Sequence, residues 1–77
     1  MTTKEFEIQY ALGILSEDQK FKMAKNVQTS RRVLSILAND INLAIRIRIH
    51  DNPNTPWTTV NMIWNRDRMQ IMQSGLV

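Results

Sequence analysis

The chain has 77 residues, no cysteine and one histidine, which excludes a disulfide framework and a zinc site built from Cys and His ligands. Ten Lys and Arg residues against seven Asp and Glu residues give a net charge of +3, so we expect a mildly basic, mixed surface. No apolar run approaches the roughly 18 to 20 residues that span a bilayer, and residues 1–7 lack the layout of a secretory signal. These features favour a single soluble, cytoplasmic domain with a modest core.

The first predicted helix covers residues 4–15. Its apolar residues recur mainly at intervals of four, which places them on one face of a helix: Phe6, Tyr10, Ile14, Ala11 and Leu15. Gly13 lies inside this pattern and is expected to weaken the helix by about 1 kcal/mol relative to Ala. The pattern therefore predicts an N-terminal helix with one apolar face.

A second helix is predicted over residues 17–25. Ser16 is a good N-cap residue, and Gln19, three residues later, completes the pattern of a capping box. The acids Glu17 and Asp18 lie in the first turn, where they complement the helix dipole. Phe21 is expected to be the main core residue of this helix.

A third helix follows the connector 26–30. Thr29 or Ser30 can cap it, and its apolar residues have the spacing of a buried face: Val33, Leu34, Ile36 and Leu37. Asn39 and Asp40 are expected to end this helix and to cap the next one.

A fourth helix is predicted from residue 41 to about residue 50, with Ile41, Ala44, Ile45 and Ile49 on one face. Residues 45–49 also alternate strictly between isoleucine and arginine, which is typical of a half-buried strand. No second alternating segment is present to pair with such a strand, and this favours the helix.

A fifth helix is predicted after the turn at residues 51–54, with Thr55 as its cap and Pro56 at its first position. Its expected core face comprises Trp57, Val60, Ile63 and Trp64. The helix is expected to continue through residues 66–69 and to stop at 74–75. Five helices with short connections predict an all-α fold, a small antiparallel helical-repeat array.

An internal repeat relates residues 26–30 to residues 52–56, since each has Asn followed by Thr three residues later. The helices that follow align as well: Leu34 with Val60, Leu37 with Ile63, and Ala38 with Trp64. The chain at this point resembles the variant leucine-rich repeat, a relative of the HEAT-like helical repeats. The segments that carry the resemblance are Leu37–Asp40, Ile45–Arg46, and Ile49–Pro56 with its Asn-Pro-Asn-Thr-Pro sequence.

The resemblance divides the single domain 1–77 into an N-terminal helix, a degenerate repeat over 16–38, a clearer repeat over 39–68 and an apolar tail over 69–77. It implies a helical solenoid fragment that binds proteins and sometimes nucleic acid, without catalysis. The first repeat lacks both prolines, and the chain has about two repeats where such arrays usually stack three or more. The iron–sulfur version of the family needs cysteines that this chain does not have.

The sequence offers little for catalysis. The only candidate base is His50, at the end of a predicted helix, where an interaction with the helix dipole is the simpler interpretation. The two glycines, Gly13 and Gly75, are far apart and cannot form a phosphate-binding loop. We therefore predict no enzymatic activity, no catalytic residue, no metal and no cofactor.

Two tryptophans and an apolar tail are the main candidates for binding. Trp57 and Trp64 are two helical turns apart and share a face; Trp64 is expected in the core, whereas Trp57 is either core or an interface anchor. The tail residues Met69, Ile71, Met72, Leu76 and Val77 have no further repeat to cover them. The predicted partner-binding residues are Trp57, Arg66, Arg68, Met69 and Met72.

The basic residues permit a second hypothesis. They either contact phosphates along the repeats or form a solvated outer face. The candidate nucleic-acid contacts are Lys20, Lys25, Arg31, Arg32, Arg46 and Arg48, of which the resemblance implies a structural role for Arg46.

The leading functional hypothesis is a small protein-interaction module that binds another protein and forms homo-oligomers through its apolar C-terminal helix. Its size fits an accessory regulator or inhibitor of the kind that phages and mobile elements encode, such as a phage lysis-timing accessory protein. A nucleic-acid-binding regulator is the alternative, and a structural assembly subunit is a third.

Overall fold

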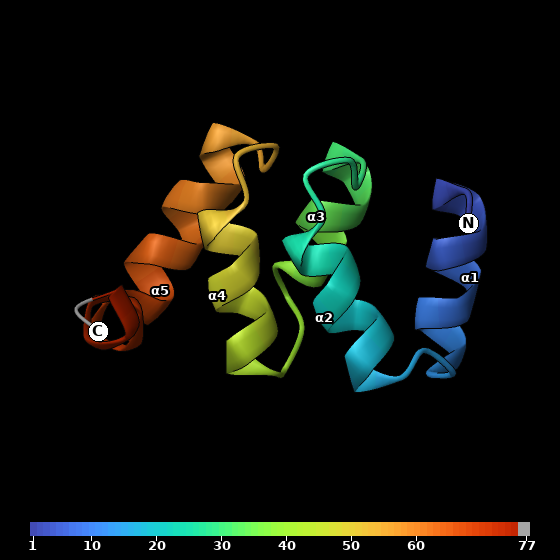
Figure 1. Ribbon diagram of the computed structural model, residues 1–77, viewed down its shortest axis with the longest axis horizontal. Coiled ribbons are helices and arrows are strands. Elements are labelled where there is room, and N and C mark those ends of the chain that lie inside the picture. Colours follow the sequence, from blue (N-terminus) through green and yellow to red (C-terminus); the bar gives the residue numbers. More distant parts are fainter. Residues whose placement is uncertain (76–77) are drawn as a thin grey trace.

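The computed structural model describes residues 1–75, and the chain forms five helices there with no strand (Figure 1). The helices are α1 (Thr3–Leu12), α2 (Glu17–Lys25), α3 (Arg31–Leu37), α4 (Leu43–Asp51) and α5 (Trp57–Gly75). Consecutive helices run in opposite directions (Figure 1). The all-α prediction is confirmed, and residues 45–49 lie in α4 rather than in a strand. The predicted tail residues Leu76 and Val77 lie outside the described residues.

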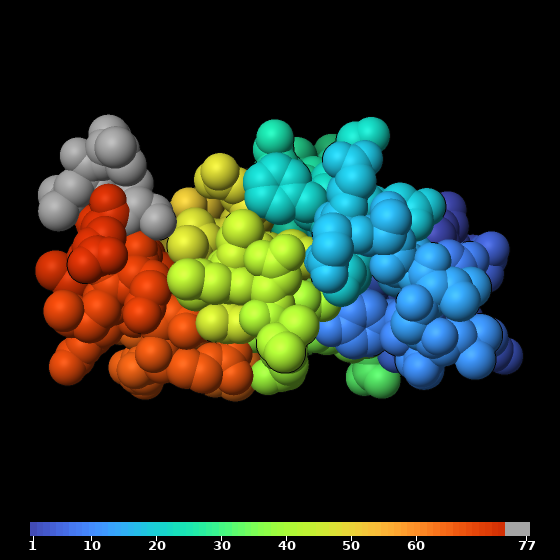
Figure 2. Space-filling view, turned by 90° about the horizontal axis from the view of Figure 1, so that it is seen from below, coloured from blue at the N-terminus to red at the C-terminus, as the bar shows by residue number. Residues whose placement is uncertain are grey.

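The helices form two layers (Figures 1 and 2). The rear layer holds α1, α3 and the first part of α5, and the front layer holds α2 and α4. Helix α1 packs on α3, α2 packs on α3 and α4, and α4 also packs on α3 and α5. Helix α5 bends at Asp67, which has non-helical φ and ψ, and its last turns run towards the front layer beside α4.

The core lies between the two layers. Its fully buried large side chains are Phe6, Leu34, Leu37, Ile45, Ile49 and Ile63, and Ile71 adds to it from beyond the bend in α5. Burying side chains of this size stabilises a fold by about 1.5 to 3 kcal/mol each before the cost of ordering the chain. The predicted buried face of the third helix is confirmed by Val33, Leu34 and Leu37.

The first helix ends earlier than predicted. Gly13 adopts the left-handed conformation, with φ +70°, and forms the C-cap of α1 instead of lying inside the helix. The chain therefore turns before Ile14, which is exposed, whereas Leu15 is buried after the turn. A capping box of Thr2 and Glu5 that the sequence analysis missed begins α1.

Of the predicted N-caps of α2 and α4, the first is confirmed and the second is wrong. The capping box of Ser16 and Gln19 is confirmed, with Ser16 Oγ accepting from the Gln19 N–H at 3.1 Å. The prediction for α4 was wrong, because its N-cap is Asn42, whose Oδ1 accepts from the Ala44 N–H at 2.9 Å. Asp40 is buried in a polar cluster instead, and Ile41 is 93% exposed in the turn.

Two aromatic residues are less buried than predicted, Phe21 and Trp64, and Trp57, which the sequence left as either core or interface anchor, is exposed. Phe21 is partly buried against the core with Lys25 and Arg48 over its ring, and Ala24 is the buried residue of α2. Trp57 is 77% exposed and Trp64 is 36% exposed, whereas Ile63, which was also predicted in the core face of α5, is fully buried. The prediction that Trp64 lies in the core was therefore wrong.

Candidate functional site

The two connecting loops that were aligned in sequence have the same hydrogen bonds. Asn26 Oδ1 accepts from the Gln28 N–H, and Asn52 Oδ1 accepts from the Asn54 N–H, both at 2.9 Å. These two asparagines are 26 residues apart and form the C-caps of α2 and α4 with nearly equal φ and ψ. The internal repeat of the sequence is thus also a repeat of local geometry.

The threonine of each loop ties the loop to the preceding helix. Thr29 Oγ1 donates to the Met23 carbonyl at 2.7 Å, and Thr55 Oγ1 donates to the Ile49 carbonyl at 2.6 Å. Thr55 was predicted to cap α5, but its hydroxyl bonds to the end of α4 instead. Each hydroxyl gives a second hydrogen bond to a carbonyl that already accepts from the N–H of the C-cap asparagine, and so reinforces the end of the helix.

Asn52 also joins the two repeats. Its Nδ2 donates to the Ala24 carbonyl at 2.8 Å and to the Asn26 carbonyl at 3.0 Å, both at the end of α2. Asn54 Nδ2 donates to the Thr29 carbonyl at 2.7 Å. The Asn-Pro-Asn-Thr-Pro segment is therefore part of the scaffold, and it fixes the spacing between α2 and α4.

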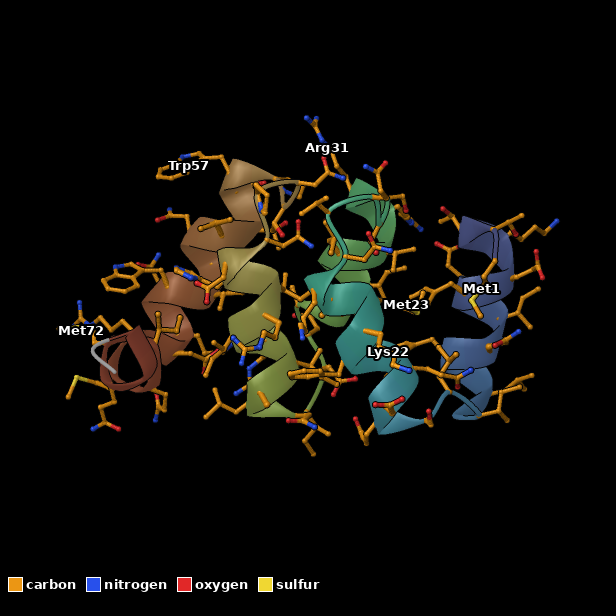
Figure 3. All side chains as sticks on the ribbon, in the orientation of Figure 1. Met1, Lys22, Met23, Arg31, Trp57 and Met72 are labelled. Carbon is orange, nitrogen blue, oxygen red and sulfur yellow. The ribbon has the colours of Figure 1, made fainter. Side chains whose placement is uncertain are left out.

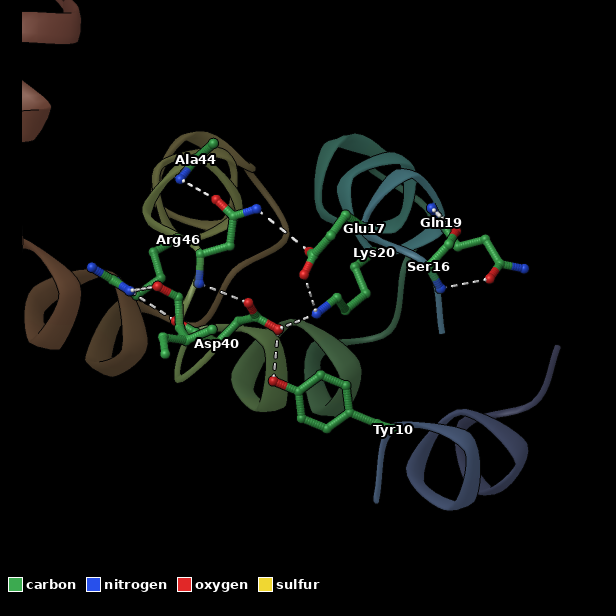
Figure 4. Close-up of polar contacts among 10 residues, drawn as sticks. Tyr10, Ser16, Glu17, Gln19, Lys20, Asp40, Ala44 and Arg46 are labelled. Carbon is green, nitrogen blue, oxygen red and sulfur yellow. Dashed lines mark hydrogen bonds and ion pairs between the residues drawn. The ribbon is translucent and has the colours of Figure 1, made fainter. Parts of the chain in front are cut away.

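A buried carboxylate organises the region where α1, α2 and the start of α4 meet (Figure 4). Asp40 Oδ2 accepts from Lys20 Nζ at 2.9 Å and from the Tyr10 hydroxyl at 2.8 Å, and Asp40 Oδ1 accepts from the Asn42 N–H at 2.8 Å. Burial raises the pKa of Asp40, but these hydrogen bonds outweigh burial and leave that pKa below its ordinary value. Burial, together with the hydrogen bond to Asp40, raises the pKa of Tyr10 to about 12.

A second ion pair occupies the corresponding place in the next repeat. Arg46 Nε and Nη2 donate to the two carboxylate oxygens of Asp67 at 2.9 and 3.1 Å. Arg46 Nη1 also donates to the carbonyls of Asp40 and Ile41. The hydrogen bonds from Arg46 lower the pKa of Asp67, although burial opposes them. Two of the candidate nucleic-acid contacts, Lys20 and Arg46, are thus inner parts of the scaffold.

The other four candidate nucleic-acid contacts lie nearer the surface. Arg32 Nε pairs with Glu7 Oε1 at 2.7 Å. Lys25 and Arg48 both lie over the ring of Phe21, each 5.4 Å from its centroid. Arg31 is exposed and projects at the start of α3 (Figure 3). The structure therefore places Lys20 and Arg46 in buried ion pairs, Lys25 and Arg48 together over Phe21, and Arg31 and Arg32 at other surface positions.

Most of the predicted partner-binding residues lie on the open side of α5. Trp57, Arg68, Met69 and Met72 are all exposed, and Figure 3 shows Trp57 and Met72 at the end of the array opposite α1. Arg66 is also exposed, but its Nη2 donates to the Ala38 carbonyl at 2.8 Å and joins α5 to the end of α3.

Sequence reasoning missed three contributors to the exposed apolar surface. Trp64 was assigned to the core, but it lies at the surface against the ring of His50, with ring centroids 6.0 Å apart. His50 lies in the last turn of α4, as predicted, and its Nδ1 is 2.9 Å from Asp51 Oδ1. Ile8 and Leu12 on α1 are also exposed. Their spacing of four residues was the signal that could have revealed them.

Within residues 1–75 there is no group of three or more His, Asp or Glu side chains placed to hold a metal ion. None of the helices in that part of the chain has the length and apolar composition that crossing a membrane requires. Comparison of the chain with protein-family models, with curated proteins and with solved structures finds no match.

Proposed function

We propose that the chain is a non-enzymatic protein-interaction module that binds its partner through the open side of α5. The observation that carries this proposal is the set of large apolar side chains exposed on that helix: Trp57, Met62, Trp64, Met69 and Met72. Tryptophan is enriched at the energetic centres of protein interfaces, and methionine adapts to irregular partner surfaces. Several large apolar side chains exposed on one helix are typical of an interaction site.

The wider role that we propose is that of a cytoplasmic accessory regulator or inhibitor, of the kind that phages encode to time lysis. The apolar side chains exposed on α5, which suit binding to another protein, support this role. We also propose that the chain is related to the variant leucine-rich repeats and HEAT-like repeats. The repeated Asn and Thr hydrogen bonds at the ends of α2 and α4 support that relationship.

Site-specific photo-crosslinking in cells tests the proposed binding surface. A photoreactive phenylalanine analogue at position 57 or 69 is expected to give a discrete adduct with a protein, because both side chains are exposed on α5. The same analogue at Arg31, an exposed polar position on α3, is the matched control and should give none. Absence of a position-specific protein adduct from both α5 positions would contradict the proposal.

A nucleic-acid-binding regulator is the alternative proposal. Three observations support it: the net charge of +3, the exposed Arg31, and the two cations that lie over Phe21, which are Lys25 and Arg48. Gel shifts with nonspecific DNA and RNA across a salt series test it, since phosphate contacts give binding that weakens steeply with salt. Absence of binding at low salt would exclude this alternative.

A further inference from the structure

The two ends of the helical array expose different, unpartnered helix faces. At the first end, α2 has no front-layer neighbour on the side of α1 within residues 1–75 (Figures 1 and 2). A cleft of about 340 Å³ lies there between the start of α1 and the loop after α2. Its lining includes Phe6, Met23 and Asn26. The place that a front-layer helix would take next to α2 is therefore partly open.

The outer side of α1 is apolar. Phe6 and Tyr10 face inwards, and their ring centroids are 5.4 Å apart. Ile8 follows Phe6 by two residues and Leu12 follows Tyr10 by two, which is a rotation of about 200°, so both lie on the opposite side of the helix. Ile8 is 52% exposed and Leu12 is 67% exposed. We call Ile8 and Leu12 the α1 face.

The opposite end of the array presents a larger apolar surface. Trp57 and Trp64 share one side of α5, and Met72 lies beyond the bend at Asp67, where the helix runs towards the front layer. We call Trp57, Trp64 and Met72 the α5 face. Beyond this face the structure has no further rear-layer helix within residues 1–75. The α1 end of the array thus lacks a front-layer helix, whereas at the α5 end the last turns of α5 extend towards the front layer.

The two ends also differ in charge. Residues 1–18 hold four acidic side chains and one lysine, but three of these acids pair with cations of the same chain: Glu7 with Arg32, Glu17 with Lys20 and Asp18 with Lys22. Residues 57–75 hold two arginines and one aspartate. That aspartate, Asp67, is already paired with Arg46 inside the fold. The difference in charge between the two ends is therefore small, and any attraction between them comes mainly from their exposed apolar side chains.

We propose that copies of this chain associate head to tail, with the α5 face of one copy on the α1 face of the next. The proposal rests on the proposed function, since it names a second copy as the partner of α5. The last turns of α5 would occupy the open place beside α2, while Trp57 and Trp64 cover Ile8 and Leu12.

The loop after α2 supplies a polar contact suited to this arrangement. Within the chain, Asn52 holds the preceding helix by donating to main-chain carbonyls at its end. The corresponding residue of the first repeat, Asn26, borders the cleft beside α1. Where a docked helix ends beside Asn26, the amide of Asn26 would donate to its main-chain carbonyls in the same way. The contact between copies would then repeat the contact between repeats.

A head-to-tail contact joins two different surfaces, so each copy keeps one free end and assembly continues unless a ring closes. Analytical ultracentrifugation of the wild-type chain over about 10 µM to 1 mM is expected to show species that grow with concentration beyond a dimer. A strict monomer over this range would overturn the proposal. A protein adduct from position 57 in cells would still uphold the proposed function in that case.

Two single-end variants test the polarity of the contact. Leu12→Lys blocks the α1 face and Trp57→Lys blocks the α5 face. When the two variants are mixed, the two blocked faces cannot join, because each carries an added lysine and like charges repel. Each variant alone is expected to remain monomeric, with self-association weakened by more than about tenfold. Their equimolar mixture is expected to form a 1:1 complex, because each variant supplies the face that the other lacks.

Control variants distinguish a specific contact between the two faces from a general effect of added charge. Ile41→Lys places the same charge on an exposed residue between α3 and α4, and it should assemble like the wild type. Circular dichroism verifies that the variants are folded, and Ile8→Lys replaces Leu12→Lys if the latter unfolds. Dimerisation of the α1-face variant by itself would indicate a symmetric α5–α5 contact and would overturn the proposal. Failure of the mixture to form a complex would overturn it as well.

Discussion

The loops that follow α2 and α4 share only two residue types at equivalent positions, Asn and Thr, yet they have the same hydrogen bonds. The first loop lacks both prolines of the second. The comparison shows that the asparagine and threonine side chains set the loop geometry, because they satisfy the ends of the helix. The prolines are not required for that geometry; they limit the conformations of the unfolded chain instead.

The two repeats differ in whether a front-layer helix precedes them. Asn52 is 5% exposed because α2 precedes its helix in the front layer, whereas Asn26 is exposed at the edge of the array. Lys20 pairs with Asp40 and Arg46 pairs with Asp67 in corresponding places. We therefore expect the same local interactions to stabilise the fold more where a neighbouring repeat covers them, and the following predictions test this difference.

The largest effects are expected at the two buried aspartates. Asp40→Ala and Asp67→Ala should each lower the free energy of unfolding by about 3 kcal/mol. Asp67→Ala leaves the largely buried Arg46 without its counter-charge. Asp40→Ala leaves Lys20 with only the exposed Glu17 as its counter-charge and removes the acceptor of the Tyr10 hydroxyl. Urea unfolding followed by circular dichroism measures the change. Asp18→Ala, which removes an exposed ion pair with Lys22, is the control and should cost less than about 1 kcal/mol. Equal losses in all three variants would show that burial of the pairs does not matter.

The next largest effect is expected where the loops differ in burial. Asn52→Ala should cost about 2 kcal/mol, because it removes both donated hydrogen bonds to the end of α2. Asn26→Ala removes one side-chain hydrogen bond, to the Gln28 N–H, at an exposed position and should cost about 0.5 to 1 kcal/mol. The same unfolding measurement compares them, and a larger loss from Asn26→Ala would contradict the role of Asn52 as the joint between repeats.

Stability is expected to fall at both extremes of pH. The lowered pKa values of Asp40 and Asp67 mean that their contribution is present above the ordinary value of 3.8 and is lost as the pH falls through the folded values. The pKa of Tyr10 is raised from 10.0 to about 12, so its contribution is present below pH 10 and is lost as the pH rises from 10 to 12. Thermal unfolding over a range of pH measures the loss of stability on both the acidic and the alkaline side. Tyr10→Phe should make the alkaline fall shallower and leave the acidic one; an unchanged alkaline limb would contradict this assignment.

The smallest effect is a stabilisation. Val27 occupies the position in the first loop that Pro53 occupies in the second, and Asn26 and Asn52 before them have nearly the same φ and ψ. Val27→Pro should therefore raise the free energy of unfolding by about 0.5 to 1 kcal/mol. Pro53→Val should lower it by a similar amount. A destabilising Val27→Pro would show that the two loops are less alike than their hydrogen bonds indicate.

Local signals in the sequence predicted much of the fold. The helix over residues 17–25 and its capping box follow from side chains and main-chain groups only three residues apart. The buried positions of α3 follow from the spacing of its apolar residues. The match between the loops at 26–30 and 52–56 could also be read directly, because the side chains bond within their own segment or to the preceding helix.

The candidate site could be predicted only in part. Trp57, Met69 and Met72 are exposed, as binding by the apolar C-terminal helix requires. Trp64 could not be placed, because its position on the edge of α5 depends on the contact with His50. The charge pattern did not reveal which cations are engaged, because Lys20 and Arg46 find their aspartates 20 or more residues away.

The sequence by itself determined where the helices form and how the two loops close, since those interactions are short-range. Only the tertiary structure decided which apolar residues the core has room for. The core accepts Ile63 and Ile71 and leaves Trp57, Ile8 and Leu12 in solvent, because no helix of the described chain covers the two ends of the array. The open ends, and with them the surfaces proposed to bind, result from how the helices stack.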